Sequence, residues 1–172
     1  DENNDTKIEE FFDDDNALQV EEQKEDKQEN TTTSNVTNYN YIAVLEIPSI
    51  NLKRGIVDIN SDYNDVKYNI EFMKRDDNKI IFASHNGNYY YSYFGKLKDM
   101  ELGDDINFYD NNRLYKFIYS ESYVIKKDGY ADIYCDPTKK CIVLITCLEE
   151  NDDAQIVYIG YLSRVEPYEN EE

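Results

Sequence analysis

Cys141-Ile142-Val143-Leu144-Ile145-Thr146-Cys147 is the stretch of sequence that decides the fold. It is a short run of mainly β-branched apolar residues, which is the pattern of a buried β-strand. A second run of this kind, Gln155–Leu162, follows an acidic turn at Glu149–Asp153. A cysteine at the end of a rigid strand is held in a fixed geometry and can still meet solvent. A reactive thiolate needs that combination.

Cys147 has two interpretations. Free cysteines are among the most buried residues and commonly act as small hydrophobic groups. The single histidine of the chain, His85, ends another apolar run, Ile80–Gly87, where that run reaches a turn. Two strand ends that are distant in sequence can meet at one end of a sheet. Cys147 and His85 are therefore a candidate nucleophile and general acid-base pair.

Strand-like runs separated by turn residues recur from Tyr41 onward, and they predict a mainly β fold that forms a closed or nearly closed barrel. The length of 172 residues fits one domain with a sizeable core. Two segments, Asp62–Phe72 and Ser92–Met100, have helical spacing. The eight expected strands are Tyr41–Ile47, Gly55–Ile59, Lys79–Ser84, Asp105–Asp110, Arg113–Tyr119, Ser122–Lys126, Cys141–Thr146 and Gln155–Leu162.

The first 38 residues differ from the rest of the chain. Residues 1–30 carry 13 acidic and 3 basic side chains, so they hold −10 of the total net charge of −19. Such a composition buries too little apolar surface to fold, which predicts a mostly disordered stalk at 1–38 and a folded domain at 39–172. A short amphipathic helix through Ile8, Phe11, Phe12 and Leu18 is the alternative. The negative charge also argues against nucleic acid as a partner.

Five motifs resemble, in order and spacing, those of the sortases, which are cysteine transpeptidases of the Gram-positive cell surface. They are Ile47–Leu52, Ala83–Gly87, Phe94 with Leu97, Leu102–Asp104 and Leu144–Cys147. The resemblance runs from about Tyr41 to about Val165 and implies an eight-stranded closed β-barrel with a few short helices. It also implies a place at the extracellular face of the cell membrane or in the cell wall. The membrane would be reached only through an anchor that this sequence does not contain.

The resemblance further implies a reaction. Cys147 would cleave a C-terminal LPxTG-like sorting signal through a thioester, and an amine from a cell-wall precursor or a pilin would then resolve that thioester. His85 would serve as general acid and general base. Thr146 would orient the substrate, or its hydroxyl would only satisfy a neighbouring strand.

One position departs from the family pattern. Sortases carry an arginine on the strand after the cysteine, and Gln155 stands eight positions after Cys147, where that arginine is expected. Gln155 can donate a hydrogen bond to an oxyanion or a substrate, but it carries no charge. Arg164 would lie roughly 30 Å further along an extended strand, so it is a poor substitute. The sequence thus predicts a transpeptidase, either active or weakened, or, alternatively, a sortase-fold protein that binds peptides without turnover.

The cysteines and carboxylates leave two further questions open. Cys135 and Cys141 flank a tight loop, and in an oxidising exterior they could form a disulfide or stay free. With a single histidine the chain has no zinc-binding spacing, so no metal ligand and no cofactor is expected. Scattered carboxylates could bind Ca²⁺, as in some sortases, although no EF-hand loop is present.

Overall fold

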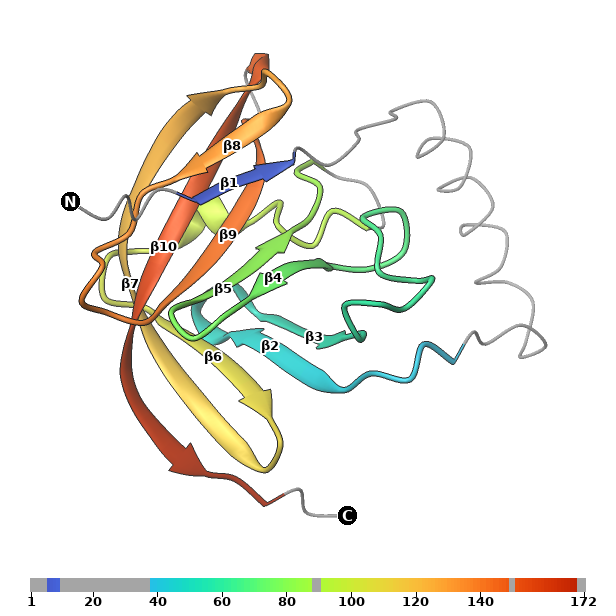
Figure 1. The fold of residues 1–172 in the computed structure, drawn as a ribbon, viewed down its shortest axis with the longest axis vertical. Coiled ribbons are helices and arrows are strands. Elements are labelled where there is room, and N and C mark those ends of the chain that lie inside the picture. Colours follow the sequence, from blue (N-terminus) through green and yellow to red (C-terminus); the bar gives the residue numbers. More distant parts are fainter. Residues whose placement is uncertain (1–5, 10–37, 88–90, 149–150, 170–172) are drawn as a thin grey trace.

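An eight-stranded sheet forms the body of the protein in the computed structural model, which describes residues 6–9, 38–87, 91–148 and 151–169. Its strand order is β3-β2-β6-β7-β10-β9-β5-β4 (Figure 1). The strands of this sheet are β2 (Ala43–Ile47), β3 (Leu52–Ile56), β4 (Glu71–Arg75), β5 (Lys79–Ala83), β6 (Asp105–Asp110), β7 (Arg113–Lys126), β9 (Cys141–Leu148) and β10 (Asn151–Pro167). A separate ribbon pairs β1 (Thr6–Glu9) with β8 (Tyr130–Ile133), and two short 3-10 helices are η1 (Pro48–Ile50) and η2 (Leu97–Asp99).

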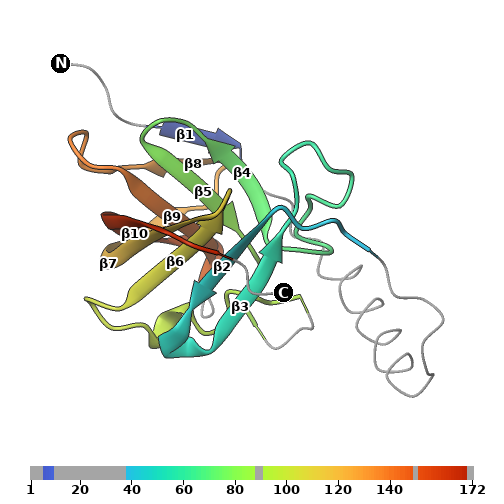
Figure 2. The same cartoon turned by 90° about the horizontal axis from the view of Figure 1, so that it is seen from below.

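The sheet curls strongly but does not close (Figure 2). The predicted mainly β fold with an eight-stranded sheet is confirmed, whereas the closure of the barrel is wrong, since β3 and β4 remain edges. Side chains of the connection between them bind to both edge strands. The Asn64 amide exchanges two hydrogen bonds with the backbone of Phe72 in β4, at 2.8 and 2.6 Å. Asn69 accepts a hydrogen bond from Arg54 of β3 at 3.1 Å. The Asn64 bonds use backbone groups at the free edge of β4 that a further strand would otherwise pair with.

The helix expected at Asp62–Phe72 is not formed, because polar side chains there bind the local backbone instead. Oxygens of Asp58, Ser61 and Asp65 each accept a hydrogen bond from the backbone N–H two residues later. Such turns compete with helical hydrogen bonding. The chain then enters β4 at Glu71, a strand that the sequence did not predict. Of the helix expected at Ser92–Met100, only the single turn η2 forms.

Two expected strands, Arg113–Tyr119 and Ser122–Lys126, are one long strand, β7. The register against β10 shifts between Ile159, opposite Glu121, and Gly160, opposite Tyr119. Ser120 is thus the extra residue of a β-bulge, which lets the strand bend while its pairing continues. The short strands β1 and β8 were not predicted either.

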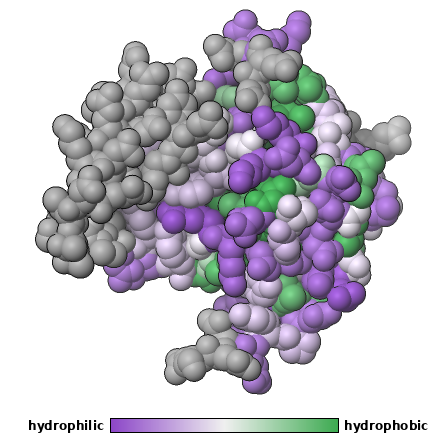
Figure 3. Space-filling view, turned by 180° about the vertical axis from the view of Figure 1, so that it is seen from behind, coloured by the Kyte–Doolittle hydropathy of each residue, from purple (hydrophilic) through white to green (hydrophobic). Residues whose placement is uncertain are grey.

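The strand β9 is buried on both faces, and this explains its uninterrupted apolar sequence. Ile142 and Leu144 belong to the core cluster inside the curled sheet, together with the aromatic rings of Phe82 and Phe108. Val143, Ile145 and four residues of neighbouring strands (Ile81, Ala83, Val157 and Ile159) belong to a second cluster with Ala131 and Ile133 of β8. The outer surface differs from these buried clusters. On the side seen from behind, hydrophilic side chains predominate, with smaller hydrophobic patches between them (Figure 3).

The N-terminal stalk is described only at Thr6–Glu9, which pairs antiparallel with β8. Ile8 therefore lies in a strand, where a helix was the alternative expectation. Phe11, Phe12 and Leu18 lie outside the described residues, and the domain boundary at residue 38 stays a prediction. Within the described part of the chain, no helix has the length and apolar character needed to cross a membrane.

Deleting residues 1–30 is expected to change the free energy of unfolding by less than about 1 kcal/mol, since a short outer strand adds little to stability. The same deletion should speed amide hydrogen exchange in β8, because it removes the partner strand β1. Denaturant unfolding combined with hydrogen–deuterium exchange checks both expectations. A stability loss of several kcal/mol would contradict them and would place β1 in the main cooperative unit.

Candidate active site

The hairpin of β9 and β10 brings Cys147 and Gln155 side by side. They are direct partners in the antiparallel register, so their side chains lie on the same face of the sheet. Cys147 is a half-buried cysteine near the end of β9 and is in no disulfide. Gln155 is 1% exposed. The structure therefore places the predicted nucleophile and the residue at the family arginine position in immediate contact range.

The segment that carries His85 is joined to the end of β9 by three hydrogen bonds. The Ser84 N–H donates to the Ile145 carbonyl at 3.2 Å, and the Thr146 hydroxyl donates to the Ser84 carbonyl at 2.8 Å. The Asn86 amide donates to the Cys147 carbonyl at 2.8 Å. His85, 2% exposed, lies between these anchors.

The parallel pairing of β5 and β9 sets His85 against Cys147. Ala83 is the partner of Ile145 in this register. β5 ends at Ala83, and the hydrogen bonds of Ser84 and Asn86 keep the next residues, His85 among them, alongside Thr146 and Cys147 at the end of β9. The structure thus brings together the three predicted residues His85, Cys147 and Gln155.

Thr146 points to the other face from Cys147 and is 1% exposed. Its hydroxyl is engaged by the Ser84 carbonyl, which fits the second interpretation from the sequence, a satisfied strand threonine. This contact holds the His85 segment on β9. A role of Thr146 in orienting substrate stays a prediction.

Glu71 is a site residue that the sequence did not indicate. It is the partner of Ala83 in the β4–β5 register, so it lies on the same face as His85. Burial, followed by the nearby charge of Asp65, raises the pKa of Glu71 to about 7, while the Val66 N–H and His85 act in the opposite direction. The sequence analysis did not identify Glu71 because it predicted a helix where β4 begins.

Replacing Glu71 with glutamine is expected to flatten the decline of stability between pH 4.5 and 7. The pKa of Glu71 is raised from 4.5 to about 7, so in this window the folded state keeps a proton that the unfolded chain loses. Stability contributed by the neutral carboxyl is complete below the unfolded pKa and falls as pH rises. After allowance for solvent screening, the parent should lose about 1–2 kcal/mol more unfolding free energy than Glu71→Gln over this pH range.

Denaturant unfolding of the parent and Glu71→Gln proteins at pH 5 and pH 7.5 measures this difference. The exposed Glu101 provides the matched control, because Glu101→Gln removes a carboxylate without removing a buried one. Parallel pH curves for the parent and Glu71→Gln proteins would contradict the assignment.

The Gln155 side chain has an unused hydrogen-bonding capacity. Its amide oxygen and nitrogen are both buried, and neither has a hydrogen-bond partner among the described residues. A buried polar group without a partner costs about 1–3 kcal/mol. A conformational adjustment that admitted a carbonyl oxygen or an oxyanion beside Cys147 would supply that partner.

Lys127 is a second site residue that the sequence analysis missed. Its Nζ lies 4.0 Å from the Cys147 Sγ. It follows β7 directly and is separated from β9 by β10, so only the three-dimensional strand order reveals its proximity. A signal was present in the alternation of β7, because Lys127 has the same parity as Ile125, the partner of Gln155.

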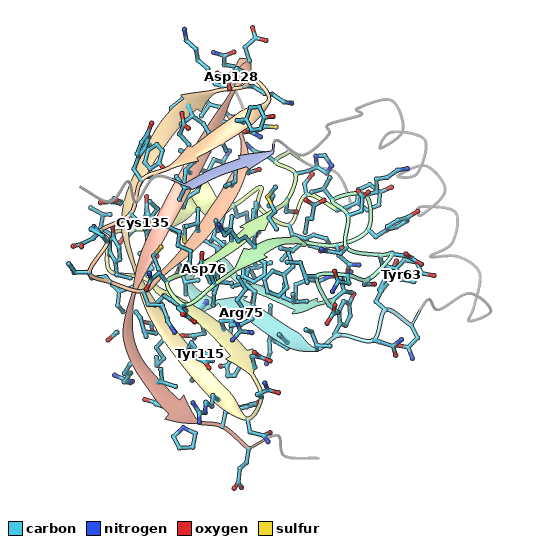
Figure 4. All side chains as sticks on the ribbon, viewed as in Figure 1. Tyr63, Arg75, Asp76, Tyr115, Asp128 and Cys135 are labelled. Atoms are coloured by element: carbon cyan, nitrogen blue, oxygen red, sulfur yellow. The ribbon has the colours of Figure 1, made fainter. Side chains whose placement is uncertain are left out.

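The four arginines of the chain all lie away from Gln155. Arg75, at the end of β4 (Figure 4), forms a salt bridge with Asp110. Arg54 donates to Asn69 and stacks on the ring of Tyr93. The other two, Arg164 and Arg113, lie toward the far end of the β7–β10 pair from Gln155, and Arg164 pairs with Glu166.

The other two cysteines lie at the opposite end of β9 from Cys147. Cys135 lies in the connection between β8 and β9 (Figure 4), and Cys141 begins β9. Both are buried and in no disulfide, and Cys141 donates a hydrogen bond to Cys135 with 2.8 Å between the sulfurs. This bond lowers the pKa of Cys135 and raises that of Cys141. The structure thus has the unbonded form of the pair.

Among the described residues there is no group of three or more acidic, histidine or cysteine residues that could hold a metal ion, and the expectation of no cofactor stays a prediction. A hollow of about 410 Å³ lies between the η1 turn on one side and Gly87 and Ser92–Asp99 on the other. Gly87 is close in sequence to His85, but neither His85 nor Cys147 lines this hollow.

Comparisons with known proteins agree with this arrangement. A family model for the sortase domain matches residues 45–163, while no curated protein sequence matches the chain. Sortase A of Listeria monocytogenes is similar in structure, with a TM-score of 0.60 and 19% identity over 75% of this chain and 91% of its own. A Clostridium perfringens sortase D5 transpeptidase reaches a TM-score of 0.57 and 16% identity over 84% and 89% of the two chains.

A third neighbour is sortase C of Streptococcus pneumoniae, whose structure was described as informative about catalysis and pilin substrate specificity. Its TM-score is 0.60, with 12% identity over 90% of this chain and 93% of that one. At such identities these likenesses show the fold alone. The family match is stronger, because it spans more than half of the chain and includes His85, Cys147 and Gln155. The resemblance inferred from the sequence is therefore confirmed: this chain belongs to the sortase family of cysteine transpeptidases.

Proposed function

We propose that this protein is a sortase-type transpeptidase that uses Cys147 as nucleophile and His85 as general acid and base. The observation that carries the proposal is the convergence of strand ends. Cys147 is the register partner of Gln155, and the His85 segment is hydrogen-bonded to the last residues of β9. Cys147 and Gln155 lie in paired strands, and hydrogen bonds of the residues on either side of His85 hold its segment at the same end of the sheet.

The first half of the reaction is acylation. The Cys147 thiolate attacks a backbone carbonyl of the substrate, and a carbon–sulfur bond forms while the carbonyl oxygen takes the negative charge. The peptide carbon–nitrogen bond then breaks, and His85 gives its proton to the leaving amine. Gln155 supports this step through its unpaired amide, which can donate a hydrogen bond to the oxyanion.

Transfer to an amine completes the cycle. The incoming amine attacks the thioester carbonyl, His85 accepts the proton, and the carbon–sulfur bond breaks to regenerate the thiolate. The proposed substrate is an LPxTG-like sorting signal, and the proposed acceptor is an amine of a cell-wall precursor or a pilin. This reaction would take place at the extracellular face of the membrane or in the cell wall of a Gram-positive bacterium, without a cofactor.

A second candidate function is favoured by Gln155 itself. A neutral amide at the position of the family arginine provides no charge for a developing oxyanion. A sortase-fold protein of this kind could bind sorting peptides and turn them over slowly or not at all.

Mass spectrometry of the intact protein with an LPxTG-like peptide separates the two functions. The transpeptidase should gain the mass of the acyl fragment on Cys147, and hydroxylamine should release it as expected for a thioester. Cys147→Ala provides the control and should gain no mass. Saturable peptide binding without an adduct would instead support the second function, and an adduct on Cys147→Ala would exclude Cys147 as the nucleophile.

A further inference from the structure

Lys127 reaches Cys147 from two strands away. Its backbone N–H donates to the Asp153 carbonyl at 2.8 Å, which continues the β7–β10 pairing beyond the end of β7 and fixes the origin of its side chain. The turn to β8 begins here, next to Asp128 (Figure 4). From this point the lysine stem extends past β10, and its Nζ lies 4.0 Å from the Cys147 Sγ.

The strand registers explain why Lys127 is on the correct face. Ile125 and Cys147 are both partners of Gln155, on β7 and β9 respectively. Because strand side chains alternate, Lys127 is on the same face as Ile125. Its neighbour Lys126, the partner of Ala154, is exposed and has the opposite parity. Of these two adjacent lysines, only Lys127 can therefore place its ammonium group near the Cys147 thiol.

The electrostatic surroundings make a local cation important. The chain has a net charge of −19, and an acidic sequence, Glu149–Asp153, follows Cys147 almost directly. Such a field disfavours a thiolate. Titratable groups on the elements around Cys147 and on its face of the sheet include Lys127 after β7, Tyr123 in β7, His85 after β5, Glu71 in β4 and Asp153 in β10. Of these, Lys127 is the permanently cationic side chain near neutral pH.

We propose that Lys127 is a catalytic residue whose ammonium group stabilises the thiolate of Cys147. An arginine at position 155 would supply both a charge and hydrogen-bond donors. In this protein Lys127 supplies the charge and the Gln155 amide supplies the donors. This inference rests on the proposed function, in which the thiolate is the nucleophile. Lys127 keeps its proton throughout, so the atoms and electrons of the acyl transfer are unchanged.

The Lys127→Met variant keeps the length of the stem and removes the charge. Iodoacetamide reacts with the thiolate, so its rate on Cys147, followed from pH 5 to 10 by site-resolved peptide mass spectrometry, reports thiolate formation without any substrate. We expect the profile to move upward by about one pH unit and the rate at pH 7 to fall about tenfold, as for other closely paired charges. Acylation by a sorting peptide should fall by about 10–100-fold.

Two variants serve as controls. Lys127→Arg keeps the charge and should retain the parental alkylation profile, and Lys126→Met removes an adjacent charge on the opposite face and should also leave it unchanged. A Lys127→Met profile identical to the parent, with the fold intact by circular dichroism, overturns the inference. If Lys127→Met does not fold, Lys127→Gln and Lys127→Arg decide it, and equal profiles for these two overturn it.

The alkylation measurement keeps this inference distinct from the proposed function. A parent protein that never forms a peptide adduct refutes the transpeptidase, while the Lys127→Met profile still decides whether Lys127 stabilises the thiolate. A parent protein that forms the adduct, together with unchanged alkylation and acylation in Lys127→Met, refutes the role of Lys127 and leaves the transpeptidase intact.

Discussion

Replacing His85 with alanine is expected to lower the rate of Cys147 acylation by about 10²–10⁴-fold, the usual contribution of a positioned general acid or base. His85 is the single histidine of the chain, so no other imidazole can take over proton transfer. Its segment is held against β9 by the bonds of Ser84 and Asn86, so the loss of the ring leaves the nucleophile in place. Single-turnover acylation with an LPxTG-like peptide measures the effect.

Added imidazole provides the control for His85→Ala. The side chain is 2% exposed, so its removal leaves a space of the shape of the lost ring. Imidazole in solution should restore part of the acylation rate if His85 transfers protons, whereas a purely structural defect would not respond. Acylation of His85→Ala at the parental rate would rule out His85 as the acid and base.

Replacing Gln155 with arginine is expected to raise the single-turnover acylation rate by about 10–10³-fold, the range found for one oxyanion donor. Gln155 is the register partner of Cys147, so a guanidinium at this position would lie beside the developing charge. Charged donors form hydrogen bonds roughly twice as strong as neutral ones. Because Lys127 already supplies a charge at 4.0 Å from Cys147, we expect the gain in the parent background to be near the lower end.

The double variant makes this prediction more specific. Gln155→Arg should raise the acylation rate by a larger factor in the Lys127→Met background than in the parent. In that background the new guanidinium replaces the cation that the Lys127→Met change removed. Gln155→Met is the neutral control and should lower the rate, because it removes the amide donor while roughly keeping the size of the side chain. Flat or falling rates in both arginine backgrounds, with the fold intact, would contradict the assignment of Gln155.

The local sequence pattern was sufficient to predict a strand wherever the strand itself is a distinct apolar run. The runs at Lys79–Ser84, Asp105–Asp110 and Cys141–Thr146 are strands with the expected bounds to within two residues. The first and the last of these runs lead directly into His85 and Cys147, so both residues were site candidates from the sequence alone. Strand-end chemistry is visible locally because an apolar run buried on both faces stands out from its polar flanks.

The rest depended on contacts between distant segments. Asn64 bonds to the backbone of Phe72 and so covers the free edge of β4, and no local pattern distinguishes such a residue from a helical one. Glu71 is near His85 through the pairing of β4 with β5. Lys127 reaches Cys147 across β10. Each of these placements requires the strand order, which hydrophobic periodicity does not specify.

The parallel pairing of β5 with β9 has a consequence for how activity is acquired during folding. Ser84 and Thr146, which join the two strands by a hydrogen bond, are 62 residues apart in the chain. Closing such a long loop is entropically unfavourable and comes before any reward from the contact itself. His85 and Cys147 therefore meet only when this long-range pairing is complete. In a partly folded chain, the Cys147 thiol would therefore lack its acid-base partner. Such a chain would not form thioesters with neighbouring polypeptides before folding is complete.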